Sequence, residues 1–157
     1  MKSRMDSPAV IVPDASQALQ ALGTALFASA EKTGVPRRLL FLAYLRASQM
    51  NGDGVCVDLH SRNAAAAGES EERIRAVSTW RETASFKDAE RAALALSESV
   101  TRLGDPENPV PDEVFDEAAL HFGEAALATL IAGIATANLW NRLNVATRQL
   151  PDSFSLQ

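Results

Sequence analysis

The sequence predicts an all-α protein of about six to eight helices. The 157 residues are 46% hydrophobic and rich in alanine, whereas aromatic residues make up only 6%, a mixture that favours packed helices over sheets. Apolar residues recur at helical spacing in several segments, and no segment alternates apolar and polar residues as a half-buried strand does. We expect residues 1–13 to form an extended segment and residues 14–157 to form a single domain.

The first half of the chain is predicted to form three helices. Asp14 is a candidate N-cap for the first helix, which Gly34 ends. The second helix is expected over residues 37–50, and because it is apolar on more than one face we place it at the centre of the fold. The third helix is expected over residues 54–67, since Gly68 is a natural terminator.

The second half is predicted to form four or five further helices. Ser70 and Ser85 are candidate N-caps for the first two, and a proline-rich loop, DPENPVPDE, follows them. Asp112 is a candidate N-cap after this loop. The last element covers residues 123–148 and is either one helix or two with a break near residues 138–144.

Charge and composition exclude several classes of protein. The net charge of −5 and the pI near 5.0 argue against a nucleic-acid-binding protein. The single cysteine cannot form an intramolecular disulfide, which suits a reducing cytoplasm. We find no apolar core of signal-peptide length at the start, and the most apolar later stretch, residues 125–137, is too short to span a bilayer. We therefore expect a cytoplasmic protein that binds neither nucleic acid nor membrane.

The stretch MNGDGVCVDLH, residues 50–60, holds the single cysteine, Cys56, and His60 four residues later. On a helix these side chains lie on the same face about one turn apart, where an imidazole can take a proton from a thiol. If Asp53 is the N-cap, Cys56 lies in the first turn, where the helix dipole favours the reactive thiolate. An ionised Asp53 close to the sulfur disfavours the thiolate, so the direction of the pKa shift stays open.

Two other interpretations of Cys56 stay open from spacing alone. A lone cysteine in an alanine-rich helix is commonly a small core residue, and the spacing by itself favours that interpretation. A metal site would need further ligands, because Cys56, His60 and either Asp53 or Asp58 make an incomplete set. We predict neither a metal nor a cofactor.

Residues 45–101 contain this motif, an alanine-rich segment, a Gly-Glu turn and the pattern W-R-E…F…E-R-A-A-L. They resemble the AhpD-like alkylhydroperoxidase group of the carboxymuconolactone decarboxylase family. The segment IATANLWNRLNVATR resembles the same group, so the likeness covers roughly residues 35–148. It implies an all-α fold, a homo-oligomer that is a trimer or a hexamer, and a thiol peroxidase that takes a small-molecule peroxide and a thiol reductant.

The resemblance implies a role for each residue of the motif. Family members with two cysteines attack the peroxide with the second and resolve the product with the first, while a histidine moves protons. Here the second cysteine is Cys56, the histidine is His60, and Asp53 stands in the place of the first cysteine. A glutamate that classical AhpD proteins carry twelve residues before the first cysteine falls on Phe41.

Glu90 and Glu98 lie on the matching later helix and are further candidates to supply a carboxylate. The commoner role of such charges is to form a solvated helix face, which we favour for both. Trp80, Phe86 and Trp140 are expected to be core or subunit-interface anchors rather than ligand contacts.

Three functional hypotheses follow. The first is a peroxidase in which Cys56 reacts with the peroxide, His60 acts as the base, and an external thiol replaces the missing first cysteine. The second is a non-redox enzyme of the decarboxylase kind, with Asp53 or His60 as acid or base. The third is an oligomeric binding protein whose catalytic site has decayed. We favour the first, because the Cys-x-x-x-His half of the motif is retained.

Overall fold

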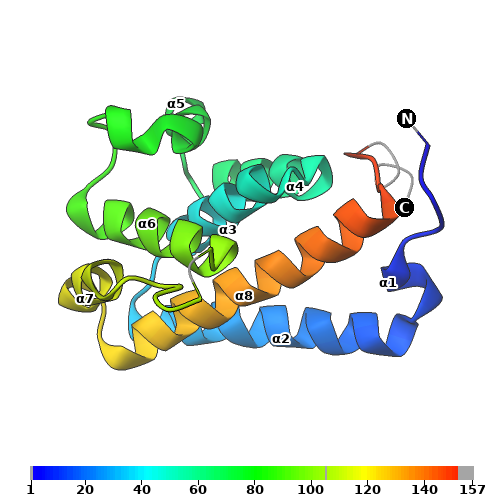
Figure 1. Cartoon of the computed structure of the whole chain (residues 1–157), viewed down its shortest axis with the longest axis horizontal. Helices are drawn as coiled ribbons and strands as arrows, with labels where there is room; N and C mark the ends of the chain where they lie inside the picture. The colour runs from blue at the N-terminus through cyan, green and yellow to red at the C-terminus, as the bar shows by residue number, and fades with distance from the viewer. Residues whose placement is uncertain (1, 105, 152–157) are drawn as a thin grey trace.

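Helix α3, Arg37–Asn51, forms the centre of the molecule in the computed structural model, which describes residues 2–104 and 106–151. Its side chains Leu40, Leu42 and Leu45 are at most 1% exposed. The helix packs against α4, α6 and α8, described below, and these surround it in Figure 1. A helix that is apolar on more than one face must be covered on more than one side, and the central position predicted for it is confirmed.

The remaining elements are helical as well. They are α1 Pro8–Ile11, α2 Pro13–Thr33, α4 Gly54–Ala66, α5 Glu71–Ala76, the 3₁₀ helix η1 Val77–Glu82, α6 Asp88–Arg102, α7 Asp112–His121 and α8 Glu124–Thr147. Residues 2–104 and 106–151 thus form eight α-helices and no strand. The prediction of an all-α fold with about six to eight helices is confirmed.

The two longest helices, α2 and α8, lie against each other along one side of the molecule (Figure 1). The N-terminal segment runs back to the end of α8, where the backbone amide of Arg4 donates to the carbonyl of Thr147 at 2.9 Å. Helix α5 lies on the far side of α6 from α2 (Figure 1). Within the two described ranges, we find no helix with the length and apolar character that crossing a bilayer requires.

Two of the predicted helix starts are confirmed and three are wrong. Asp53 caps α4, and the Ser70 hydroxyl oxygen caps α5 by accepting a hydrogen bond from the Arg73 amide at 3.2 Å. Asp14, Ser85 and Asp112 do not cap α2, α6 and α7, whose N-caps are Val12, Lys87 and Pro111.

Local chemistry explains where these helices begin instead. Pro13 occupies the first position of α2, for which its fixed φ is suited, so Asp14 falls inside the first turn. Helix α6 begins after Lys87, because the Lys87 amide donates to the Glu90 carboxylate at 2.8 Å. Each of the three N-caps therefore lies one or two residues away from the side chain that the sequence pattern favoured.

The N-terminal segment also differs from the expected extended conformation. Ser7 accepts a hydrogen bond from the Ala9 amide at 3.3 Å, and Pro8 takes the first helical position, so residues 8–11 form the short helix α1. A capping side chain followed by proline is a helix-start signal, and here it is sufficient for a single turn.

Helices α3 and α8 approach closely where Tyr44 meets Gly133. A β-carbon added at Gly133 would lie 2.3 Å from the Tyr44 hydroxyl oxygen and 2.9 Å from a ring carbon. The Tyr44 ring is 7% exposed and makes edge contacts with Phe27 and Phe41. Glycine is therefore required at position 133 for lack of space and not for its backbone conformation.

We expect Gly133→Ala to lower the free energy of unfolding by about 1–3 kcal/mol, because the Tyr44 ring must shift and lose its edge contacts with Phe27 and Phe41. Gly23→Ala in α2 is the matched control, since no atom lies within 4 Å of its added carbon, and it should raise stability by up to about 1 kcal/mol. Urea unfolding measures both. Tyr44→Phe should recover part of the loss; equal stability of the two alanine variants would contradict the prediction.

Candidate functional site

The turn between α3 and α4 places Asp53 at the start of α4. Gly52 ends α3 with a positive φ of 67°, which lets the next residue begin a new helix. The Oδ1 atom of Asp53 accepts hydrogen bonds from the backbone amides of Val55 at 3.1 Å and Cys56 at 3.2 Å. Asp53 thus caps α4 and sets Cys56 in its first turn.

The second carboxylate oxygen of Asp53 faces α8. This atom, Oδ2, accepts hydrogen bonds from the side-chain amides of Asn141 and Asn144, each at 3.0 Å. Asp53 is only 2% exposed, so four N–H donors replace the water that its carboxylate loses on burial. The carboxylate therefore ties the start of α4 to α8.

Asn138, Asn141 and Asn144 form a ladder of buried amides along one side of α8. The Asn51 amide donates to the side-chain oxygens of Asn138 at 2.8 Å and Asn141 at 3.0 Å, and Asn138 donates to Thr101 at 2.9 Å. Helix α8 runs through this region without a break. The sequence analysis did not assign these asparagines to the site. Their three-residue spacing puts the amides on one face of the helix and indicates a shared partner.

Cys56 is 4% exposed and lies beside the Asp53 carboxylate. Burial raises the pKa of the thiol, and the hydrogen bond and negative charge of Asp53 raise it further. The amides of Asn141 and Asn144 act in the opposite direction, and Nδ2 of Asn144 donates to the sulfur at 3.4 Å. The thiol pKa stays above its ordinary range, so Cys56 is protonated at neutral pH.

His60 lies on the same helix, with its ring against Tyr44 at a centroid distance of 5.4 Å. Burial lowers the pKa of His60 to about 4, although the charge of Asp53 acts to raise it, so the imidazole is uncharged at neutral pH. Neither ring nitrogen has a hydrogen-bond partner among the described residues, and both are shielded from solvent. No hydrogen bond therefore joins this imidazole to Cys56.

Cys56 and His60 both line a cavity of about 340 Å³. Its wall is mostly apolar, and Phe41 lies in it. Other apolar lining residues are Leu26, Phe27, Tyr44, Val55, Leu59, Ala137 and Trp140. The described lining residues include one arginine, Arg62, and no lysine, and the Arg62 guanidinium lies 2.7 Å from the Asp58 carboxylate.

No three His, Cys, Asp or Glu side chains in residues 2–104 and 106–151 are placed to hold a metal ion.

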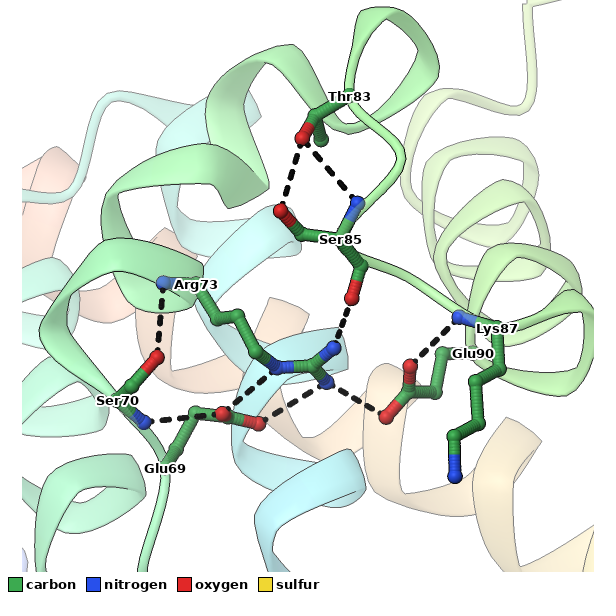
Figure 2. Close-up of polar contacts among 7 residues, drawn as sticks. All are labelled: Glu69, Ser70, Arg73, Thr83, Ser85, Lys87 and Glu90. Atoms are coloured by element: carbon green, nitrogen blue, oxygen red, sulfur yellow. Dashed lines mark hydrogen bonds and ion pairs between the residues drawn. The ribbon is translucent and has the colours of Figure 1, made fainter.

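Glu90 does not line this cavity. It accepts hydrogen bonds from Arg73 at 2.6 Å and from the Lys87 amide, and Figure 2 shows Arg73 held between Glu69 and Glu90. The same guanidinium also donates to the carbonyl of Ser85. Although burial alone would raise the pKa of Glu90, Arg73 and the Lys87 amide hold it below its ordinary value. These contacts fasten α5 to the start of α6.

Glu98 also lies outside the cavity lining, in a second cluster that holds η1 on α6 and α3. Its carboxylate accepts hydrogen bonds from Arg46 at 2.7 Å, Arg81 at 2.5 Å and the Trp80 indole at 2.9 Å. The side chains of Glu90 and Glu98 are 12% and 14% exposed, so neither forms the solvated helix face we expected. Trp80 and Phe86 are buried core residues, whereas Trp140 lines the cavity.

The fold and this site together define an AhpD-like helical protein, with a capped cysteine and a histidine one turn later on the helix that follows the central one. The chain belongs to the carboxymuconolactone decarboxylase family, whose sequence profile matches residues 13–99. A similar solved structure is ATU0492 from Agrobacterium tumefaciens, a protein of unknown function assigned provisionally to antioxidant defence as AhpD. It has a TM-score of 0.84 and 32% identity, and the likeness covers 95% of this chain and 97% of that one.

Three further proteins are similar over most of this chain. The uncharacterized protein YdfG of Bacillus subtilis is 35% identical over 116 residues, which are 74% of this chain and 78% of YdfG. The uncharacterized protein YnjA of Escherichia coli is 35% identical over 105 residues, which are 67% of this chain and 56% of YnjA. The debrominase Bmp8 has a TM-score of 0.75 and 25% identity, with 90% of this chain and 75% of Bmp8 covered.

We expect Asp53→Cys, which recreates a C-x-x-C motif, to destabilise the protein by about 2–4 kcal/mol. A thiol is a weak acceptor, so the α4 cap is lost and the Asn141 and Asn144 amides lose a buried partner. Urea unfolding in reducing buffer measures the loss. Asp58→Cys, at an exposed position of the same helix, should change stability by less than about 0.5 kcal/mol. Similar values for the two variants would contradict this account of the cap.

The lowered pKa of His60 predicts a loss of stability in acid. Its pKa is about 4 in the folded protein and about 6.5 in the unfolded chain, so the unfolded chain binds more protons between these values. Stability should therefore fall as the pH drops below about 6.5, by about 2 kcal/mol between pH ~7.5 and pH ~5. His60→Leu should remove this part of the slope in urea unfolding; an unchanged slope would show that the imidazole is not held neutral.

Proposed function

We propose that the protein is a thiol-dependent peroxidase that reduces organic hydroperoxides through Cys56. The observation that supports this proposal is that the Cys56 thiol and the uncharged His60 imidazole line one apolar cavity of about 340 Å³. A ligand in this cavity would therefore meet a nucleophile, a base that is unprotonated at neutral pH and an apolar binding space.

In the proposed first step, the Cys56 sulfur attacks the terminal oxygen of the hydroperoxide. The O–O bond breaks, a sulfenic acid forms on Cys56, and the leaving alkoxide takes up the proton that the thiol gives away, so that an alcohol departs. His60 is the proposed carrier of this proton, because its imidazole is uncharged and neither nitrogen has a partner among the described residues. A hydroperoxide in the cavity would stand between the two side chains.

In the proposed second step, an external thiol restores Cys56. Asp53 cannot form a disulfide, and Cys56 is the single cysteine of the sequence. One thiol therefore condenses with the sulfenic acid to give a mixed disulfide and water. A second thiol then displaces Cys56 as a free thiol and leaves with the first as a disulfide. Each turnover consumes one hydroperoxide and two thiols.

The cavity supports a neutral ligand over an anionic one. A carboxymuconolactone-type substrate carries carboxylates, and the Asp53 carboxylate, buried beside Cys56, would repel them. The non-redox decarboxylase hypothesis therefore has weaker support here.

We also propose that the protein forms the trimer or hexamer implied by its family resemblance, since α8 exposes the apolar side chains Leu139 and Val145.

A second candidate activity is the removal of halogen from a small aromatic compound. It is favoured by the similarity to Bmp8, of which a cysteine-to-alanine variant was solved in complex with 2,3,4-tribromopyrrole. The apolar cavity, with Phe27, Phe41 and Trp140 in its wall, is of a kind that admits a flat aromatic ring. Bromide release from such a compound in the presence of a thiol distinguishes this activity from peroxide reduction.

We expect the purified protein to oxidise dithiothreitol when cumene hydroperoxide is added and to form a sulfenic acid on Cys56. Cys56→Ser should reduce the rate to that of the uncatalysed reaction, and His60→Leu should slow it about 10²-fold or more. His121→Leu is the matched control, since His121 pairs with Glu117 near the end of α7, and it should keep the wild-type rate.

Two results would overturn the proposed function. The first is wild-type protein that neither oxidises the thiol in response to peroxide nor gives a dimedone adduct at Cys56. The second is a Cys56→Ser variant that keeps full activity on a lactone acid, which would favour the decarboxylase hypothesis.

A further inference from the structure

We propose that Asn144 is a further catalytic residue, whose side-chain amide stabilises the Cys56 thiolate, and that Asp53 is the positioning residue that aims this amide at the sulfur. The proposal rests on the function proposed above, since it concerns the same sulfur. In this proposal Asp53 orients a catalytic side chain and does not merely replace the first cysteine of the family motif.

The two protons of the Asn144 amide have different partners. Nδ2 of Asn144 donates to the Asp53 carboxylate at 3.0 Å and to the Cys56 sulfur at 3.4 Å. A neutral thiol is a weak acceptor, whereas hydrogen bonds to a charged acceptor are about twice as strong. The N–H that faces the sulfur therefore favours the thiolate over the thiol, and this is the form that attacks a peroxide.

The neighbouring amide of Asn141 also acts to lower the thiol pKa, but its two hydrogen bonds go to other groups. Its Nδ2 donates to the Ser48 hydroxyl oxygen at 3.0 Å and to the Asp53 carboxylate at 3.0 Å, which accounts for both of its protons. Asn141 is fully buried and its oxygen accepts from Asn51, so the side chain is fixed at both ends. Asn144 is thus the member of the ladder whose amide donates a hydrogen bond to the sulfur.

Asp53 determines which end of the Asn144 amide faces Cys56. A carboxylate only accepts hydrogen bonds, so the nitrogen of the amide must point toward it, and a turn by 180° would set two oxygens against each other. Asp53 cannot follow such a turn, because its other oxygen is held by the backbone amides of Val55 and Cys56. The Asp53 carboxylate therefore has two opposite effects. Its charge disfavours the thiolate, and its hydrogen bond fixes the Asn144 amide that stabilises the thiolate.

The test is the rate at which iodoacetamide alkylates Cys56, because at equal access to the sulfur this rate follows the thiolate fraction, and it needs no peroxide. We expect Asn144→Ala to slow alkylation about tenfold or more at pH ~8. Asn144→Leu, which keeps much of the side-chain volume, should have the same effect if the alanine variant folds poorly. Asn138→Ala is the matched control, because Asn138 belongs to the ladder without touching Asp53 or Cys56, and it should stay within about twofold of wild type.

The positioning role of Asp53 is tested by a double-mutant cycle. Asp53→Asn removes a charge beside the sulfur and should speed alkylation, and Asn144→Ala should have a smaller effect in that background than in the wild type. Equal effects in both backgrounds would overturn the positioning role. Equal effects of Asn144→Ala and Asn138→Ala would overturn the catalytic role.

Peroxide reactivity separates this inference from the proposed function. If alkylation responds as expected but wild-type Cys56 does not react with cumene hydroperoxide, the thiolate contact stands and the proposed function fails. If the wild type turns over peroxide and Asn144→Ala slows neither alkylation nor sulfenic-acid formation, the inference alone fails.

Discussion

The buried carboxylate of Asp53 is the interaction on which the geometry of the site depends. One of its oxygens caps α4 and the other receives two amides from α8, so it fixes the position of two helices at once. A carboxylate at 2% exposure needs such a set of donors, because burying it without hydrogen-bond partners costs several kcal/mol. Asn141 and Asn144 occupy buried positions of α8 for this reason.

The energetic balance at Cys56 follows from the same carboxylate. A position in the first turn of a helix favours an anion by about 0.3–1 kcal/mol, which is less than burial and an adjacent negative charge cost a thiolate. The thiol pKa is accordingly raised and not lowered. Cys56 therefore lies at a helix start, in surroundings that keep its sulfur protonated at neutral pH.

Sequence reasoning reached the parts of the molecule that depend on local chemistry. The central position of α3 follows from apolar residues on several faces, and the capping role of Asp53 follows from its place before a helix. Asp14 and Ser85 were assigned wrongly because proline geometry and a carboxylate three residues into the helix decide those starts. The amide ladder and the ion pairs of Glu90 and Glu98 join residues 17 to 91 positions apart, which local patterns do not bring together.

The raised thiol pKa and the shielded imidazole have a common consequence for the proposed chemistry. A protonated, buried thiol reacts slowly with oxidants that do not enter the cavity, since the thiolate is the nucleophile. In the proposed mechanism a ligand inside the cavity would displace water from the sulfur and thereby strengthen the hydrogen bond from Asn144. In the proposed mechanism the reactivity of Cys56 is therefore coupled to occupancy of the cavity.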